Sequence, residues 1–248
     1  MQTFLRKLMQ SVGAVTEKTI HRFQKQQASH SFHSVNSPEK TTEIPIAEMR
    51  LRKILEAVES QEVRSLIPSL SGKKVLHASE TGTTQWEALE EKGAQSIVNF
   101  DVNVLGHLSI PPHEKIPATV KGHLEAAPFR DDSFDFLLCF SSTTQEHSLE
   151  WMKEIARLLK DGSRVVISFL HPYFEHQLNL KPGFFHEISQ YFMSLRKAGI
   201  YVEEIREVKA DPRFRSLLSG SAKYEKEFSQ IEGIPLIVFF RGVRLKRR

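Results

Sequence analysis

The residues best suited to bind a ligand lie between Lys73 and Asn103. A short apolar run, Val75-Leu76, leads to a turn of small and polar residues from Ser79 to Thr84, and a second apolar run, Ile97 to Phe100, ends at Asp101. Two strands joined by a helix within about thirty residues form a βαβ unit with parallel strands. In open α/β sheets the first turn of such a unit lies where ligands bind, and the acid that ends the second strand can bind a ribose hydroxyl. We therefore expect a nucleoside-containing ligand at this turn and at Asp101.

The rest of the chain supplies the elements that would hold this unit in place. Apolar periodicity predicts a helix from about 46 to 67, which Pro68 ends, and another from 145 to 160. Strands are predicted at 118–120, 134–140 and 164–170, and a helix at 185–197 is followed by strands at 200–205 and 235–243. This alternation predicts an α/β fold with a mostly parallel sheet. One strand of the last pair is expected to be antiparallel, because no helix is predicted between the two.

Two stretches resemble the class I S-adenosylmethionine-dependent methyltransferases, in particular the type 11 branch: GHLEAAPFRDDSFDFLLCFSS, from Gly122, and EWMKEIARLLKDGSRVVIS after it. The first is similar to the family's G-D-A-x-x-L-P-F-x-D-x-S-F-D, and the second to its E-I-x-R-V-L-K-P-G-G. The matching residues are Pro128, Phe129, Asp132, Ser133, Phe134, Asp135, Glu154, Arg157, Leu159, Lys160 and Gly162. The resemblance implies a Rossmann-like, doubly wound methyltransferase fold, S-adenosylmethionine as cofactor, and a small-molecule or lipid-like acceptor.

The resemblance also implies which residues bind the cofactor. The family's first loop reads V-L-D-x-G-x-G-x-G; here His77 replaces the acid, and the glycine positions fall on Ser79, Thr81 and Thr83, with Gly82 displaced by one. Asp101 matches the acid that binds the ribose. His123 and Leu124 occupy the places of the adenine-binding acid and of the small residue after it. The implied cofactor-binding residues are therefore His77, Ser79, Thr81, Gly82, Asp101, His123, Leu124 and Ser141.

The altered loop leaves two function classes open. Side chains at the glycine positions add bulk where the backbone must approach the cofactor. Loss of the acid removes a charge-assisted hydrogen bond of about 1.5–3 kcal/mol. The chain is therefore either an active methyltransferase or a catalytically inactive relative that serves as a binding or assembly subunit for a protein partner. The missing phosphate-cradling glycines also argue against an NAD-type oxidoreductase.

Histidines after the 164–170 strand are the candidates for chemistry at the acceptor. Methyl transfer requires mainly in-line positioning, with a general base only where the acceptor must lose a proton. His171 is the candidate base, and Tyr173 and His176 accompany it in the same loop. The spacing of the histidines matches no standard metal site, so no metal is expected.

Basic charge is concentrated at the two ends of the chain. Six Lys or Arg and two acids occupy residues 1–40, and five Lys or Arg without an acid occupy residues 241–248. The residues between them sum to about −5. A basic pI indicates nucleic-acid binding when the charge forms a patch on the folded body, so no nucleic acid is expected here. The basic ends instead leave open a peripheral contact with an anionic membrane surface.

Three regions are predicted along the chain. Residues 1–44 combine a basic amphipathic helix over 1–25 with a polar linker, residues 45–71 are a helical lead-in, and residues 72–248 are the methyltransferase-like domain with its basic tail. The lone Cys139 excludes an intramolecular disulfide and favours a reducing compartment, so a cytoplasmic location is expected. The scarcity of acids in 1–25 leaves organelle targeting open. No apolar run reaches the roughly 20 residues that a bilayer span needs.

Overall fold

The computed structural model describes residues 46–79, 85–102, 119–141, 149–177, 187–213, 229 and 231–246 of the 248-residue chain. The predicted basic helix and linker over 1–44 lie outside the described residues. Two of the predicted cofactor-binding residues, Thr81 and Gly82, also lie outside them, as does the side chain of Ser141.

A seven-stranded sheet in the order β3-β2-β1-β4-β5-β7-β6 forms the centre of the fold. The strands are β1 (Lys74–Ser79), β2 (Ser96–Asp101), β3 (Thr119–Lys121), β4 (Phe134–Ser141), β5 (Leu159–Leu170), β6 (Ile200–Lys209) and β7 (Pro235–Arg244). The pairs from β3 to β5 are parallel, whereas β7 is antiparallel to both β5 and β6. The predicted α/β class, its mostly parallel sheet and its antiparallel C-terminal strand are confirmed.

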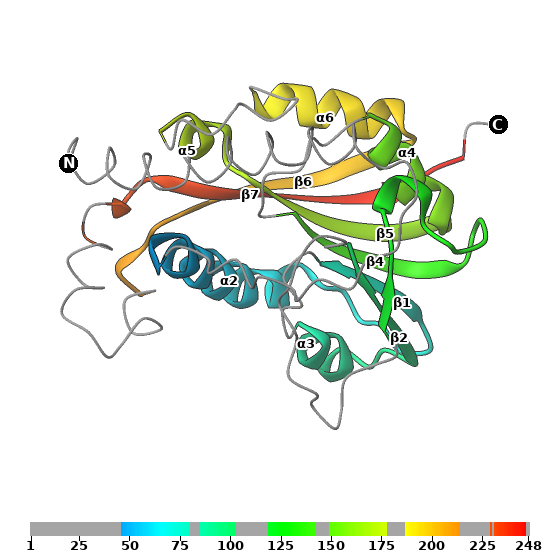
Figure 1. Ribbon diagram of the computed structural model, residues 1–248. Helices are drawn as coiled ribbons and strands as arrows, with labels where there is room; N and C mark the ends of the chain where they lie inside the picture. Colours follow the sequence, from blue (N-terminus) through cyan, green and yellow to red (C-terminus); the bar gives the residue numbers. More distant parts are fainter. Residues whose placement is uncertain are drawn as a thin grey trace, which may run out of the picture.

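Helices cover both faces of this sheet (Figure 1). On one face lie α2 (Ile46–Leu66) and α3 (Trp86–Glu91), and on the other lie α4 (Leu149–Leu158) and α6 (Ile188–Lys197). A short helix, α5 (Pro172–Gln177), follows β5, and a 3-10 turn, η1 (Leu124–Ala126), precedes β4. Alternate residues of each central strand point to opposite faces, which gives two apolar cores. Val75, Phe136 and Val166 belong to the core beneath α2, and Leu76, Leu137 and Val165 to the core beneath α4.

The structure departs from the predicted elements at the end of α4 and after β5. The helix predicted to continue to residue 160 ends at Leu158, and β5 begins at Leu159 instead of Arg164. Pairing of Leu159 with Phe134 and an ion pair from Lys160 to Asp135 hold this segment against β4. Helix α5 was not predicted, because its six residues are too few to show a helical period. Among the described residues, no helix is both long and apolar enough to span a membrane.

The parallel strands give the sheet two unlike edges. The strand ends Ser79, Asp101, Ser141 and Leu170 belong to the carboxyl edge, where open α/β sheets bind ligands. The strand beginnings at Lys74, Ser96 and Phe134 belong to the opposite, amino edge.

Candidate functional site

Ser79 and Asp101 meet at the carboxyl edge. They are the last residues of β1 and β2 and are paired in register. Ser79 is buried, and the Asp101 side chain keeps 12% of its surface exposed. A carboxylate at the end of β2 can accept hydrogen bonds from both hydroxyls of a ribose. The two residues therefore lie together at the carboxyl edge, and their binding of a ligand stays a prediction.

His77 lies two residues before the end of β1 and is buried, with 1% of its surface exposed. Its Nδ1 is 3.0 Å from Oδ1 of Asn99 on β2, and its ring packs edge-on against Phe140 at 5.8 Å between centroids. Burial lowers the pKa of His77 to about 4, and the Asn99 hydrogen bond offsets only part of this effect. The ring is therefore neutral at pH 7, where the family's loop would hold a negative charge.

Asn99 and Thr119 are polar neighbours of His77 that were missed in the sequence. Asn99 Nδ2 donates to Thr119 Oγ1 on β3 at 3.2 Å, so one chain of hydrogen bonds crosses β1, β2 and β3. The signal was present, because an asparagine in the middle of the apolar run Ile97–Phe100 needs a partner when it is buried. Its partner depends on the register of β3, which the sequence did not give.

A basic residue accompanies the ribose-binding candidate. Lys121 ends β3 in register with Asp101, and its Nζ is 3.9 Å from Asp101 Oδ2. The Lys121 side chain is 72% exposed, so this ion pair is screened by water and contributes little to stability. Gly122 donates from its N–H to the Asp101 carbonyl at 3.1 Å. A Cβ at Gly122 would lie 3.1 Å from the Phe100 ring, so a glycine lets this turn pack against β2.

The two residues predicted at the adenine end differ in exposure. His123 is exposed and directly precedes η1, whereas Leu124 is buried in the core that contains Phe134 and Ile155. Of these two side chains, only that of His123 is exposed to solvent. The predicted contact of Leu124 with a purine ring stays a prediction.

His171, the predicted base, has a partner on each ring nitrogen. Its Nδ1 accepts from the N–H of Tyr173 at 3.1 Å, and its Nε2 lies 3.2 Å from Oε2 of Glu207 on β6. Because Nδ1 is the acceptor, Nε2 carries the proton and donates it to Glu207. Burial lowers the pKa of His171, and the Glu207 carboxylate opposes this effect. To act as a base, His171 would have to give up the hydrogen bond that caps the start of α5, and its catalytic role stays a prediction.

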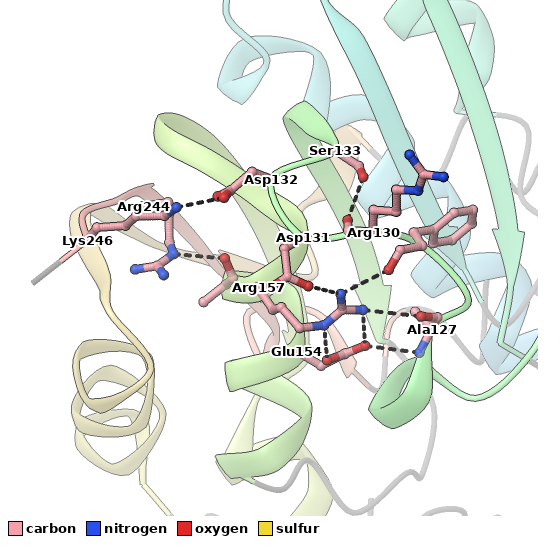
Figure 2. Close-up of polar contacts among 11 residues, drawn as sticks. Ala127, Arg130, Asp131, Asp132, Ser133, Glu154, Arg157, Arg244 and Lys246 are labelled. Carbon is pink, nitrogen blue, oxygen red and sulfur yellow. Dashed lines mark hydrogen bonds and ion pairs between the residues drawn. The ribbon is translucent and has the colours of Figure 1, made fainter.

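The amino edge contains the stretch that resembled the methyltransferases most closely, and its polar residues bind one another (Figure 2). The Arg157 guanidinium on α4 donates to both oxygens of Glu154 at 2.7 and 2.6 Å and to Asp131 at 2.5 Å. It also donates to the carbonyl oxygens of Phe129 and Ala127. We call this set, Arg157 with Glu154, Asp131 and the carbonyls of Ala127 and Phe129, the Arg157 clamp. It fixes the turn that leads into β4.

The last described residues are fastened to the same edge. Arg244 Nε donates to the carbonyl of Ala156 at 2.8 Å, and the backbone N–H of Lys246 donates to Asp161 at 2.8 Å. The Lys246 ammonium pairs with Asp132 at 2.6 Å (Figure 2). Two basic residues of the tail, Arg244 and Lys246, therefore form hydrogen bonds and an ion pair with the folded domain. Among the described residues, no group of three or more His, Cys, Asp or Glu side chains is arranged to hold a metal.

Comparison with known proteins agrees with this arrangement. Residues 84–167 match the family model of a methyltransferase domain, type 11. A structure of a SAM-dependent methyltransferase from Listeria monocytogenes is similar with a TM-score of 0.59 at 15% identity, covering 78% of this chain and 99% of that one. No match was found among curated proteins.

Two further solved structures share the fold. A methyltransferase from Haloferax volcanii, solved with the Trm112 methyltransferase activator, has a TM-score of 0.56 at 16% identity, covering 81% of this chain and 96% of that one. Geranyl diphosphate C-methyltransferase from Streptomyces coelicolor, solved with Mg²⁺, geranyl diphosphate and S-adenosyl-L-homocysteine, has a TM-score of 0.56 at 13% identity, covering 85% and 86%. Residues 84–167 thus match a methyltransferase domain, and the chain shares the fold of S-adenosylmethionine-dependent methyltransferases.

Proposed function

We propose that the domain binds S-adenosylmethionine at the carboxyl edge of β1 and β2 and transfers its methyl group to a small-molecule or lipid-like acceptor. The observation that carries the proposal is the position of Asp101. Its carboxylate ends β2 in register with Ser79, at the edge where this fold binds nucleosides. S-adenosylmethionine would supply an electrophilic methyl group on its sulfonium.

The described residues fit this cofactor at one end and depart from the family at the other. At the ribose end, Asp101 offers two acceptor oxygens to the two hydroxyls. At the amino-acid end, His77 offers a neutral ring nitrogen in place of a carboxylate. His77 therefore lacks the negative charge of the family's acid but can still accept a hydrogen bond.

Transfer to an acceptor would depend on positioning. His171 holds hydrogen bonds at both ring nitrogens, so the described residues favour an acceptor that is already nucleophilic over one that must lose a proton. Alignment of the reactants can supply a large part of a methyl transfer without a general base. This favours an uncharged nitrogen, a thiolate or an enolate-like carbon over an unactivated hydroxyl.

Isothermal titration calorimetry with S-adenosylmethionine and S-adenosylhomocysteine tests the cofactor proposal. The unsubstituted protein is expected to bind both, and Asp101→Ala is expected to weaken both by at least about tenfold, because the hydroxyl acceptor is lost. Glu87→Gln, an exposed acid on α3, is the matched control and should change neither affinity. Equal affinities for Asp101→Ala and the unsubstituted protein would contradict the proposal.

A second function, that of a binding or assembly subunit without catalysis, is favoured by His77. A neutral histidine where the family holds an acid would weaken a cationic ligand. If the folded protein bound neither S-adenosylmethionine nor S-adenosylhomocysteine at millimolar concentration, the result would favour this second function over methyl transfer. The Haloferax volcanii methyltransferase was solved with a protein activator, which makes a protein partner a reasonable part of either proposal.

We also keep the cytoplasm, with peripheral membrane contact through the basic ends, as the proposed location. Cys139 is the single cysteine of the sequence and is buried, which supports a reducing compartment. Arg244 and Lys246 are bound within the fold, so membrane contact would have to draw on other basic residues. Sedimentation with vesicles that contain phosphatidylserine, compared with neutral vesicles, tests the contact: equal sedimentation would exclude it.

A further inference from the structure

His171 is held at four points and presents one N–H to Glu207. Its backbone N–H donates to the Leu236 carbonyl at 2.8 Å, and its own carbonyl accepts from the Phe174 N–H at 2.8 Å. On the ring, Nδ1 accepts from the Tyr173 N–H at 3.1 Å, and a backbone N–H can only donate. The proton of the neutral ring therefore lies on Nε2, 3.2 Å from Oε2 of Glu207. A buried imidazole thus orients a carboxylate whose side chain is 50% exposed.

Glu207 differs from the other two glutamates of β6 in its partner. Glu203 and Glu204 pair with Arg241 at 3.7 and 3.1 Å. Among the residues that the structure describes, no Lys or Arg pairs with Glu207, whose ion-pair partner is His171. Burial lowers the pKa of His171, so its ring is mainly neutral at pH 7. Glu207 therefore carries a negative charge that the described part of the chain orients but does not neutralise.

Glu207 lies at the carboxyl edge, far along the sheet from the proposed cofactor site. β7 is antiparallel to both β5 and β6, so β5 and β6 end at the same edge. Glu207 pairs with Val238, and Val238 pairs with Phe169, which is next to the end of β5. β6 is the fourth strand from β1, which at about 4.8 Å per strand places it about 19 Å away. Glu207 is therefore too distant to contact the part of a ligand that Asp101 binds.

An exposed tyrosine accompanies this carboxylate. Tyr173 follows His171 by two residues in α5, and its side chain is 49% exposed. Helix α5 contacts β7, the neighbour of β6 (Figure 1). One imidazole ring with its two hydrogen bonds separates the Tyr173 backbone from the Glu207 carboxylate. Carboxylates and aromatic rings are the side-chain groups that bind ammonium ions, through charge and cation–π attraction.

We propose that Glu207 binds a cationic amino group of the methyl acceptor, at the end remote from the atom that takes the methyl group, and that His171 positions this carboxylate. The inference rests on the proposed function, because it assigns the bound cation to a methyl acceptor. It narrows the acceptor class to molecules that combine an uncharged nitrogen, a thiolate or an enolate-like carbon with a distant ammonium group. His171 is then a positioning residue, because it acts through Glu207.

Nuclear magnetic resonance titration of the full-length protein with n-hexylammonium and with 1-hexanol tests the recognition of charge. The two probes have the same carbon chain, and only the first carries a cation. We expect n-hexylammonium to shift the amide resonances of Tyr173 and Glu207 with at least about fivefold higher affinity than 1-hexanol. Equal affinities for the two probes in the unsubstituted protein would overturn the proposal.

Two substitutions on β6 assign this preference to one carboxylate. Glu207→Gln keeps the shape of the side chain and removes its charge, so the preference for n-hexylammonium should disappear. Glu203→Gln removes a carboxylate that already pairs with Arg241, and it is the matched control that should keep the preference. Loss of the preference in Glu203→Gln but not in Glu207→Gln would place the cation elsewhere and overturn the proposal.

A pair of substitutions at His171 tests its positioning role. Glutamine places an N–H donor near the position of Nε2, whereas leucine offers no donor to Glu207. We expect His171→Gln to keep the n-hexylammonium affinity within about twofold and His171→Leu to lower it at least about threefold. Circular dichroism and thermal unfolding show that both variants fold. Equal affinities in the two folded variants would overturn the positioning role.

Calorimetric titration of the same samples with S-adenosylhomocysteine separates this inference from the proposed function. Because Glu207 is distant from Asp101, Glu207→Gln is expected to bind S-adenosylhomocysteine within about twofold of the unsubstituted protein. If S-adenosylhomocysteine binds and Glu207→Gln leaves the n-hexylammonium affinity unchanged, this inference is overturned while the proposed function stands. Absence of S-adenosylhomocysteine binding by the folded protein would overturn the proposed function, and the assignment of Glu207 to a methyl acceptor with it.

Discussion

The two edges of the sheet differ in how completely their polar groups are paired. At the amino edge, the Arg157 guanidinium donates to two carboxylates and two carbonyls, and Lys246 and Arg244 fasten the tail beside it (Figure 2). At the carboxyl edge, His77 has a buried nitrogen without a hydrogen-bond partner among the described residues, and the ion pair of Asp101 with the exposed Lys121 is long, at 3.9 Å.

This difference separates the part of the sequence that identifies the fold from the part that would determine function. Asp132, Asp135, Glu154, Arg157 and Lys160, which match the family, all make contacts at the amino edge. They hold β4, α4 and the tail together and lie at the end of the sheet opposite the proposed ligand. A strong match in this stretch therefore supports the fold and leaves ligand binding to be tested at His77 and Asp101.

Breaking the Arg157 clamp should have the largest effect on stability. Arg157→Leu leaves Glu154, whose side chain is only 13% exposed, without its cation, and we expect unfolding free energy to fall by about 3–4 kcal/mol. Urea denaturation measures the change. Arg130→Leu, an exposed arginine of the same turn, is the control and should cost under about 0.5 kcal/mol. Equal losses in the two variants would contradict a specific role for the clamp.

Lowering the pH should reduce the free energy of unfolding, because His77 is buried in its neutral form. Its pKa is about 4 in the folded chain and about 6.5 when unfolded, so between these values only the unfolded chain binds the proton. The contribution of His77 to stability is therefore constant above pH 6.5, and about 3 kcal/mol is lost as the pH falls to 4.

Urea titrations at pH 7, 5.5 and 4 measure this loss as the difference between the unsubstituted protein and His77→Gln, which cannot titrate. The subtraction is needed because burial also lowers the pKa of His171, which acts in the same direction. Parallel pH dependence in the two proteins would mean that His77 titrates normally.

Restoring the family's loop sequence should increase the affinity of the carboxyl edge for S-adenosylmethionine. His77→Asp combined with Ser79→Gly, Thr81→Gly and Thr83→Gly is expected to tighten S-adenosylmethionine by at least about tenfold, because the acid adds a charge-assisted hydrogen bond and the glycines remove bulk. Calorimetry on the folded variant measures the gain. If the affinity does not rise, the departure from the family lies elsewhere, with His123 as the next residue to change.

Removing the ion pair between Lys246 and Asp132 should have the smallest effect on stability. The Lys246 side chain is 49% exposed and the Asp132 side chain is 39% exposed. Lys246→Ala should therefore lower the free energy of unfolding by at most about 1 kcal/mol. The loss should shrink in 1 M sodium chloride, because exposed ion pairs are screened. Thermal unfolding at low and high salt checks both statements; a large loss that is independent of salt would place the contribution in packing instead.

Alternation of strands and helices made the fold predictable, because each apolar period is a local property of the sequence. The meeting of Ser79 and Asp101 was also predictable, since parallel strands end at one edge. The partners of His77 and His171 were not. Thr119 reaches Asn99 through the register of β3, and Glu207 reaches His171 from β6, 36 residues along the chain. Such contacts depend on register and strand order, which no local period encodes.

Amide hydrogen exchange with and without S-adenosylhomocysteine tests most directly whether the ligand belongs to the carboxyl edge. Binding there should slow exchange at Ala78–Ser79, at Phe100–Val102 and at Gly122–His123, which surround Asp101 in the sheet. Exchange at 127–133 and 244–246 should be unchanged. Slowing confined to the amino edge, or no slowing anywhere in a folded protein at millimolar ligand, would contradict the proposed site.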